Sequence, residues 1–354
     1  MASIRHPYFY GILMILLTGC QGPPVGRSIG TNSSQAQALQ QRDLGVIFDA
    51  KRLSASDLPG PGDQWDMQQM QVPEAWKLQQ GSDRTIVAMV DTGCDLSHPE
   101  LADHLVPGTN ITDPGQPPQD DLGHGTATAG IVGASQVDGQ GLWGVAPRAR
   151  LMPVKVNVPG TGEVRAADAA AGIVWATDHG ANIISMSLGF DAGEEGLTAQ
   201  GLKTLAAAIH QALSHNVLVV CAAGNIDQTP ITTYPACWAG SPGFEGLISV
   251  GALDNQEQRA SYSNFGPWLT VTAPADDIPA LAIGGFGSFG GTSAAAPHVS
   301  GLAALLVNPA KPVSVATLRN WITSSAQDLG PVGPDPQYGA GCVDALKAVQ
   351  ASMQ

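Results

Sequence analysis

Short runs of apolar residues alternate with longer stretches of helical character along most of the chain. Six runs after residue 61 are nearly continuous in Val, Ile and Leu, as is typical of strands buried on both faces of a parallel sheet. The predicted strands are 85–90, 151–156, 182–187, 217–221, 247–250 and 269–272. The predicted helices are 124–134, 164–179, 200–214, 292–307, 314–325 and 343–352. This alternation predicts a single α/β domain, a parallel β-sheet flanked by helices on both faces.

The first nineteen residues are predicted to be a signal peptide. Arg5 precedes an apolar segment, 9–17, that is too short to span a bilayer as a helix. The following Leu17-Thr-Gly-Cys20 resembles the bacterial lipobox, which implies lipidation of Cys20 and residence in the cell envelope, anchored to membrane. Gln21 after the Cys resembles outer-membrane sorting if the host is Gram-negative. An ordinary secretion signal with a chance Cys is the alternative.

Residues 20–60 are predicted to form a flexible linker, and 61–354 the folded domain. Gly, Pro, Asn, Ser and Gln are frequent in the linker and apolar anchors are few. The whole chain of 354 residues has a formal net charge of −14, which argues against nucleic acid as a partner. Its 44 % of hydrophobic residues argue against disorder.

Four polar residues flanked by Gly stand at strand ends or helix starts. Asp91 ends the 85–90 strand and His124 opens the next helix. Asn225 follows the 217–221 strand, and Ser293 opens the 292–307 helix. Each one alone could be a turn or capping residue. Because ligands of open α/β sheets bind beyond the carboxyl ends of the strands, the four together indicate one reaction site.

These motifs resemble those of the subtilisin-like serine proteases. Asp91-Thr-Gly, His124-Gly-Thr and Gly291-Thr-Ser293-Ala-Ala-Ala-Pro match the three active-site motifs of that family, and Ala222-Ala-Gly-Asn225 matches its oxyanion segment. The resemblance covers about residues 65–350. It implies a subtilisin-like fold and a serine endopeptidase acting on proteins or peptides. It also implies that Ser187, Leu188 and Gly189, and on the other side Gly160, Thr161 and Gly162, pair with the bound peptide.

The chemistry of these side chains agrees with that resemblance. A serine hydroxyl needs a base to remove its proton, and His124 is suited to that role. Asp91 would orient the imidazole, while Asn225 and the Ser293 N–H would stabilise the oxyanion. Two alternatives use the same residues. An aspartic protease would need a second Asp-Thr/Ser-Gly, which the sequence lacks; an inactive envelope-bound homologue would keep the fold without turnover.

The walls expected around the substrate side chain are small and apolar. The segments 187–189 and 222–224 contain no acid, so we expect cleavage after medium or large apolar residues rather than after Lys or Arg. An acidic insert, 191–196, lies beside the substrate strand and is either a solvated loop or a source of preference for basic flanking residues. No element is predicted for the Gly-rich segment 275–289.

The sequence leaves open both the pairing of the cysteines and the binding of a structural calcium. Cys94, Cys221, Cys237 and Cys342 allow three disulfide pairings, and no zinc-binding spacing is present. No metal is required for the chemistry. Glu100 and Asp138 fall in segments that bind calcium in many members of the resembled family, so a structural calcium is left open.

Overall fold

A computed structural model describes Leu58 and residues 63–137, 141–194, 196–227 and 232–354. The predicted signal 1–19, Cys20 and almost all of the 20–60 linker lie outside this part of the chain. So does Asp138. No helix within the described ranges is both long and apolar enough to cross a membrane.

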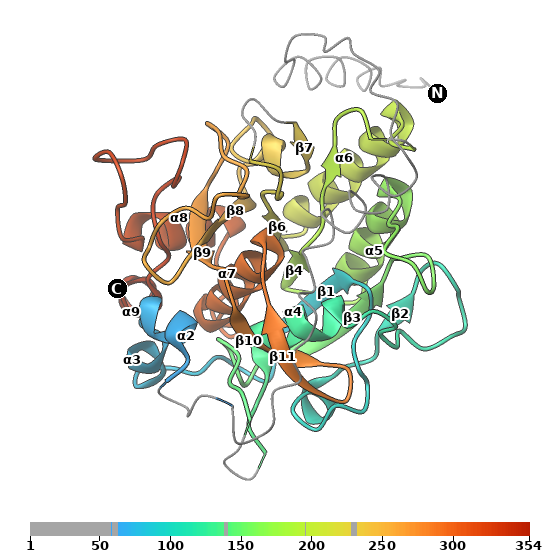
Figure 1. Cartoon of the computed structure of the whole chain (residues 1–354), viewed down its shortest axis with the longest axis horizontal. Helices are drawn as coiled ribbons and strands as arrows, with labels where there is room; N and C mark the ends of the chain where they lie inside the picture. The colour runs from blue at the N-terminus through green and yellow to red at the C-terminus, as the bar shows by residue number, and fades with distance from the viewer. Residues whose placement is uncertain (1–57, 59–62, 138–140, 195, 228–231) are drawn as a thin grey trace, which may run out of the picture.

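A parallel sheet of seven strands forms the centre of the protein. Its order is β2-β3-β1-β4-β6-β8-β9 (Figure 1). The strands are β1 (Ile86–Asp91), β2 (Thr109–Asn110), β3 (Arg150–Lys155), β4 (Ile183–Met186), β6 (Leu218–Ala222), β8 (Leu247–Leu253) and β9 (Val271–Pro274). All six predicted strands are confirmed to within a few residues, and the two-residue β2 is an addition.

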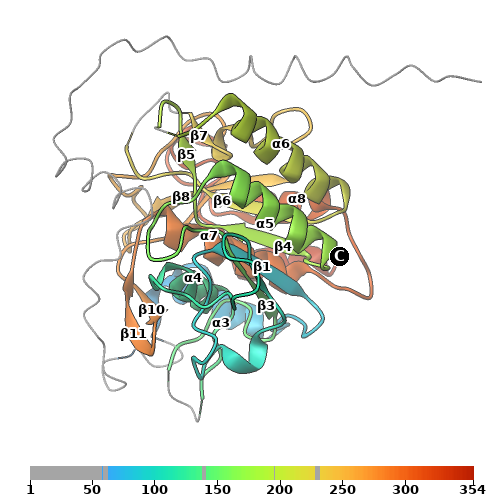
Figure 2. The ribbon, with the colours of Figure 1, turned by 90° about the vertical axis from the view of Figure 1, so that its right-hand side faces the viewer.

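Helices cover both faces of this sheet, as predicted. Figure 2 shows α5 (Ala166–Asp178) and α6 (Ala199–Ser214) side by side over one face. The other face carries α4 (His124–Gly133) and α7 (Thr292–Leu306), with α8 (Val315–Ser325) and α9 (Ala345–Ser352) beyond them. Alternate residues of β1 enter the two cores: Val87 packs on the α7 side, and Ala88 on the α5 side. This alternation explains why the strands are apolar at most positions on both faces.

The amino-terminal part of the described domain also packs on the α7 face. It contains α2 (Trp65–Gln69) and α3 (Val72–Trp76), which the sequence pattern did not predict. Asp66 of α2 is fully buried, and its Oδ2 accepts a hydrogen bond of 3.0 Å from His298 Nε2 of α7. The segment before β1 is therefore part of the fold that holds α7.

The 275–289 segment is regular, contrary to expectation. It forms an antiparallel hairpin of β10 (Ile278–Ala282) and β11 (Gly285–Phe289). Its turn passes through Gly284 at φ +68°, a conformation that glycine adopts at low cost. Gly284 N–H donates to Asp95 Oδ2 at 2.9 Å, which fixes the turn to the loop after β1. The many glycines weakened the alternating pattern by which a hairpin is recognised.

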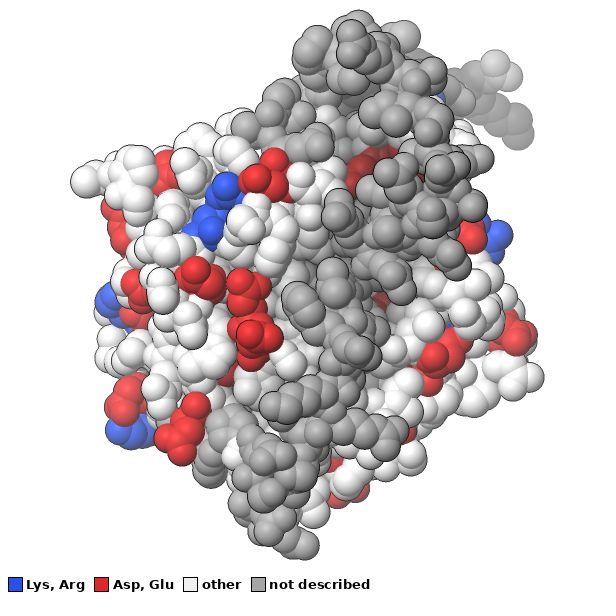
Figure 3. All heavy atoms as spheres, viewed as in Figure 1, with Lys and Arg blue, Asp and Glu red and all other residues white. Residues whose placement is uncertain are grey.

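Smaller elements complete the domain. A second antiparallel pair joins β5 (Phe190–Asp191) to β7 (Thr233–Tyr234). Two short 3₁₀ helices are Ala102–His104 and Ala236–Trp238. The four cysteines after Cys20 are all buried, and Cys94, Cys221 and Cys342 are free thiols, so none of the three disulfide pairings is formed. Acidic side chains are more widely spread than basic ones on the face in Figure 3, as the net charge of −14 leads one to expect.

Candidate active site

Asp91 and His124 meet where the end of β1 approaches the start of α4. His124 Nδ1–H donates to Asp91 Oδ1 at 2.7 Å, and the two residues are 1 % and 3 % exposed. Thr92 N–H donates to the same oxygen at 2.7 Å. The close approach of the start of α4 to the end of β1 requires glycine at position 125, because a Cβ on Gly125 would lie 2.0 Å from the Gly93 carbonyl oxygen. Two residues that are far apart in the sequence are thereby fixed as an aspartate–imidazole pair.

The electrostatic surroundings of His124 favour its protonated form. Burial alone lowers the pKa of His124, but the charge and hydrogen bond of Asp91, with the charge of Asp120, outweigh it and raise the pKa above 6.5. Nε2 of His124 is buried and has no hydrogen-bond partner within the described part of the chain. An unpartnered nitrogen of this kind is available to accept a proton from a bound reactant.

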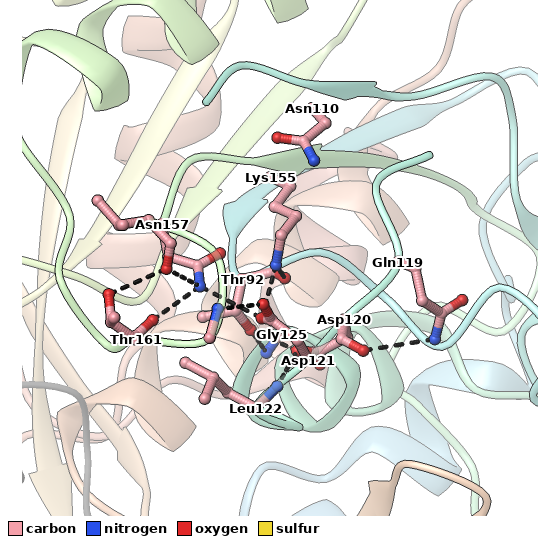
Figure 4. Close-up of polar contacts among 12 residues, drawn as sticks. Thr92, Asn110, Gln119, Asp120, Asp121, Leu122, Gly125, Lys155, Asn157 and Thr161 are labelled. Atoms are coloured by element: carbon pink, nitrogen blue, oxygen red, sulfur yellow. Dashed lines mark hydrogen bonds and ion pairs between the residues drawn. The ribbon is translucent and has the colours of Figure 1, made fainter. Parts of the chain in front are cut away.

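Asp120 holds the strand that carries Asp91 and the helix that begins at His124. Its Oδ1 accepts from Thr92 Oγ1 at 2.8 Å and from Gly123 N–H at 2.9 Å. Its Oδ2 accepts from the N–H and hydroxyl of Thr126 at 2.8 and 2.6 Å. Figure 4 shows Asp120 near Thr92, Leu122 and Gly125. Sequence reasoning did not find Asp120; its position four residues before His124 was the signal available.

Ser293 lies in the first turn of α7, where it faces the end of β4. Its Oγ donates to the Ser187 carbonyl oxygen at 3.1 Å, and Ser187 Oγ donates to the Ser293 carbonyl oxygen at 2.8 Å. The helices of Ser293 and His124, α7 and α4, pack against each other. In this conformation the hydroxyl donates to the strand end, so its proton must turn away from Ser187 before another acceptor can take it.

Asn225 is held beside the same helix start. Its Oδ1 accepts from the N–H and the hydroxyl of Thr292, both at 2.9 Å. These contacts occupy the oxygen and leave the Nδ2 amide as a donor. The N–H of Ser293 is also in the first helical turn, where no carbonyl of the same helix can accept it. Two donors therefore flank Ser293, as stabilisation of a negative oxygen requires.

The two predicted substrate segments are placed differently. Ser187, Leu188 and Gly189 follow β4 directly and line the pocket beside Ser293. Gly160, Thr161 and Gly162 lie in a turn after β3, where Gly160 N–H donates to Asp121 Oδ2 at 2.7 Å (Figure 4). Asn157 Nδ2 donates to the Thr161 carbonyl at 2.8 Å. The Gly160 carbonyl and the Gly162 N–H have no partner among the described residues.

A buried lysine reinforces that turn. Lys155 Nζ donates to Asp121 Oδ1 at 2.6 Å and to the Thr92 carbonyl at 2.8 Å. The Lys155 side chain is 3 % exposed, and Asp121 supplies its opposite charge. Lys155 and Asp121 thereby connect the 160–162 turn to the residue that follows Asp91, as Figure 4 shows.

The expectation of a pocket free of acid was wrong. The lining contains Asp191 and Thr233 together with the predicted walls. Asp191 arrives there because β5 turns back over the pocket and pairs with β7. The Asp191 side chain was assigned to an acidic insert outside the walls, since a two-residue strand pairing gives no periodic signal.

Two aromatic residues that the sequence analysis did not single out also support the site. Phe289, at the end of the β10–β11 hairpin, packs edge-on against the His124 ring with 5.2 Å between ring centroids. The Tyr262 hydroxyl accepts from Gly291 N–H at 3.2 Å and donates to Asp276. Phe289 thus contacts the first residue of α4, and Tyr262 contacts the residue that precedes α7.

Glu100 is a buried acid away from Ser293. It is 2 % exposed, and its two oxygens share the Leu142 N–H, at 3.2 Å from each. Burial raises the pKa of Glu100 to about 7, although the Leu142 hydrogen bond opposes this. Among the described residues no group of three or more His, Cys, Asp or Glu is arranged to hold a metal ion.

Comparison with known proteins agrees with the geometry. Residues 82–341 match the model of the subtilase family of S8 peptidases. The chain belongs to the subtilase family. It is 35 % identical to thermitase of Thermoactinomyces vulgaris over 289 residues, which cover 81 % of this chain and 96 % of that protein. It is also 35 % identical to subtilisin Savinase of Lederbergia lenta, covering 81 % and 98 %.

A solved structure shows the same fold. The crystal structure of MycP1 with its N-terminal propeptide removed superposes with a TM-score of 0.69 at 27 % identity, covering 80 % of this chain and 96 % of that one. The chain is therefore a subtilisin-like serine protease, a hydrolase that acts on peptide bonds. This result excludes the aspartic protease alternative.

Proposed function

We propose that the protein is an exported, lipid-anchored endopeptidase that works through an acyl-enzyme on Ser293. The observation that carries the catalytic part is the buried Asp91–His124 pair, which leaves His124 Nε2 unpartnered near the helix of Ser293. Asp91, His124 and Ser293 then form the triad, and Asn225 serves as an oxyanion donor.

In this mechanism Ser293 Oγ first leaves the Ser187 carbonyl and gives its proton to His124 Nε2 as it attacks the peptide carbonyl carbon. Asp91 accepts the Nδ1–H and stabilises the imidazolium. The Ser293 N–H and Asn225 Nδ2 donate to the tetrahedral oxyanion. When the C–N bond breaks, the leaving amine takes the proton from Nε2. Water then attacks the ester with His124 as base, and the carboxylic acid product leaves.

A serine-directed fluorophosphonate tests this assignment. We expect it to label the purified protein once, and we expect Ser293→Ala to abolish both the label and peptide hydrolysis. Ser300→Ala is a matched control, because Ser300 lies on the same helix and bonds to Ser185 Oγ at 2.8 Å. Unchanged labelling of Ser293→Ala would overturn the role of Ser293. A folded wild-type protein that neither reacts nor cleaves any peptide would instead support the inactive homologue.

The anchor is proposed from Cys20 in Leu17-Thr-Gly-Cys20. A lipoprotein carries several acyl chains, and more than one chain is needed for stable attachment. The acidic domain would be repelled by anionic lipid, so charge alone would not retain it. We expect Cys20→Ser to lose a palmitate-analogue label and membrane association, while its exported fraction keeps peptidase activity. A wild type that takes no label and fractionates as soluble protein would make residues 1–19 an ordinary secretion signal.

A structural calcium is proposed at Glu100. A buried carboxylate with one backbone donor fits a hard cation, which prefers oxygen ligands and would supply the missing positive charge. We expect calcium to raise the melting temperature over that in chelator by several degrees, and Glu100→Gln to lose this response. Exposed Glu163→Gln is the matched control and should keep it; an equal response in Glu100→Gln would place calcium elsewhere.

A further inference from the structure

The pocket beside Ser293 is closed by two residues opposite each other on a short antiparallel pair. Asp191 of β5 and Thr233 of β7 are cross-strand partners. Thr233 is 2 % exposed, and its Oγ1 donates to Asp191 Oδ1 at 2.5 Å. Asn264 Nδ2 donates to the same hydroxyl at 3.0 Å. Since a hydroxyl has one proton, these two bonds fix its direction and hold the side chain in one rotamer.

The Thr233 side chain fills the space between the two predicted walls. A Cβ on Gly189 would lie 2.8 Å from Thr233 Cγ2, and a Cβ on Gly224 would lie 3.1 Å from Thr233 Oγ1. One wall therefore meets the methyl group and the other meets the hydroxyl. Thr233 therefore requires glycine at position 189, whereas at position 224 a Cβ would first meet Asn264 Nδ2 at 2.3 Å, and the φ of +101° there also favours glycine.

Thr233 and Asp191 form the floor of the pocket, and little room is left above them. The pocket lined by these residues, Asn225 and Ser293 has a cavity volume of about 20 Å³, enough for one water or a group of similar size. Because Ser293 and Asn225 would flank the scissile carbonyl, the side chain next to that carbonyl on the acyl side enters here. A methyl or hydroxymethyl group fits the space, whereas an isobutyl or benzyl group meets Thr233.

Resting on the proposed acyl transfer at Ser293, we propose that Thr233 and Asp191 are specificity-determining residues that restrict cleavage to peptides with a small residue, alanine or serine, before the scissile bond. This replaces the preference for medium or large apolar residues expected from the walls alone. Asp191 makes the floor polar: its Oδ2 has no hydrogen-bond partner among the described residues, and burial raises its pKa while the Thr233 bond opposes the rise. Thr233 Oγ1 occupies Asp191 Oδ1, and the pocket is too small for a Lys or Arg side chain, so Lys and Arg gain nothing from this carboxylate.

The test is a set of peptides that differ only in the residue before the scissile bond: Ala, Ser, Leu, Phe or Lys. For wild type we expect kcat/KM for Ala and Ser to exceed that for Leu and Phe by about 10-fold or more. Thr233→Gly should raise kcat/KM for Leu relative to Ala by about 10-fold. Thr233→Val is the matched control, since it keeps the bulk without the hydroxyl and should retain the preference for Ala.

The lysine peptide tests Asp191. Thr233→Gly should gain activity toward Lys, and Thr233→Gly/Asp191→Asn should lose that gain while keeping the gain toward Leu. Faster cleavage after Leu or Phe by wild type, or an unchanged ranking in folded Thr233→Gly, would overturn the proposal. If Thr233→Gly does not fold, Thr233→Ser, which removes the methyl alone, must still raise Leu relative to Ala. Absence of cleavage of every peptide would instead overturn the acyl-transfer mechanism, so the two failures are distinct.

Discussion

Asp120 beside His124 and Asp191 beside Ser293 are both acids held among hydrogen bonds, yet they are bound very differently. Asp120 accepts from two hydroxyls and from backbone N–H groups of Leu122, Gly123 and Thr126, and both of its oxygens are occupied. Asp191 accepts one hydroxyl hydrogen bond from Thr233 through Oδ1. The first acid joins a strand end to a helix start, whereas the second joins two side chains across a two-residue ladder.

This difference separates the part of the site that is proposed to perform the chemistry from the part that is proposed to select substrate. A buried acid with every lone pair in use cannot be replaced without leaving donors unpaired, which costs about 1–3 kcal/mol for each group. An acid in a pocket tolerates substitution when one of its carboxylate oxygens has no hydrogen-bond partner, because water or substrate can occupy the position beside that oxygen. We therefore expect substitutions near His124 to change turnover, and those near Thr233 to change preference.

The largest effect is expected at the reacting groups. His124→Ala and Ser293→Ala should each lower kcat by roughly 10⁴- to 10⁶-fold, and the double variant should be no worse, because the two act as one unit. Steady-state kinetics on an alanine-containing peptide checks this, with peptide binding measured separately. Additive losses in the double variant would mean that the two side chains do not share a proton.

The second largest loss of kcat is expected for substitutions of Asn225. Its Oδ1 holds Thr292, so Asn225→Ala removes both a structural acceptor and the proposed oxyanion donor. Asn225→Asp separates the two, since it keeps the acceptor and loses the donor. We expect kcat to fall about 100- to 1000-fold in both variants with KM nearly unchanged. A loss confined to KM would assign Asn225 to substrate binding instead.

Most of the main sheet and the flanking helices could be predicted from the sequence, because the strands are buried on both faces and are nearly continuous in apolar residues. The reactive residues were recognisable because Gly flanks each of them at an element end. Asp91 and His124 were brought together as expected.

The pocket floor and the hairpin could not be predicted in the same way. Thr233 and Asp191 belong to two-residue strands, whose pairing depends on tertiary contacts and leaves no period in the sequence. Phe289 reaches His124 from a hairpin rich in glycine, which has low intrinsic strand preference. Asp120 was overlooked because an acid before a helix has many structural uses.

Substitution of either acid, Asp120 or Asp191, should have a smaller effect than the loss of His124 or Ser293. In Asp120→Asn the amide nitrogen replaces an oxygen that accepted from an N–H or hydroxyl donor, so we expect a loss of about 2–4 kcal/mol in unfolding free energy and a 10- to 100-fold lower kcat. Asp191→Asn should cost less than about 1 kcal/mol at pH 8, because burial raises the pKa of Asp191 and its ionisation opposes folding above that pKa. Urea unfolding measures both, with exposed Asp113→Asn as control; equal losses would remove the distinction.

The smallest effect should appear in the pH dependence. His124 must be neutral to accept the Ser293 proton, so kcat/KM should fall as pH drops through the His124 pKa, which Asp91 and Asp120 raise above 6.5. Asp120→Asn removes one of these negative charges and should move the acid limb to lower pH by roughly 0.5 unit, or about 0.7 kcal/mol. Asp191→Asn should leave the limb in place, because Asp191 is not among the charges that raise the pKa of His124. A profile of kcat/KM from pH 5 to 9 on one peptide measures both variants against wild type. An acid limb that moved equally in both would show that the field at His124 comes from the acidity of the whole domain rather than from Asp120.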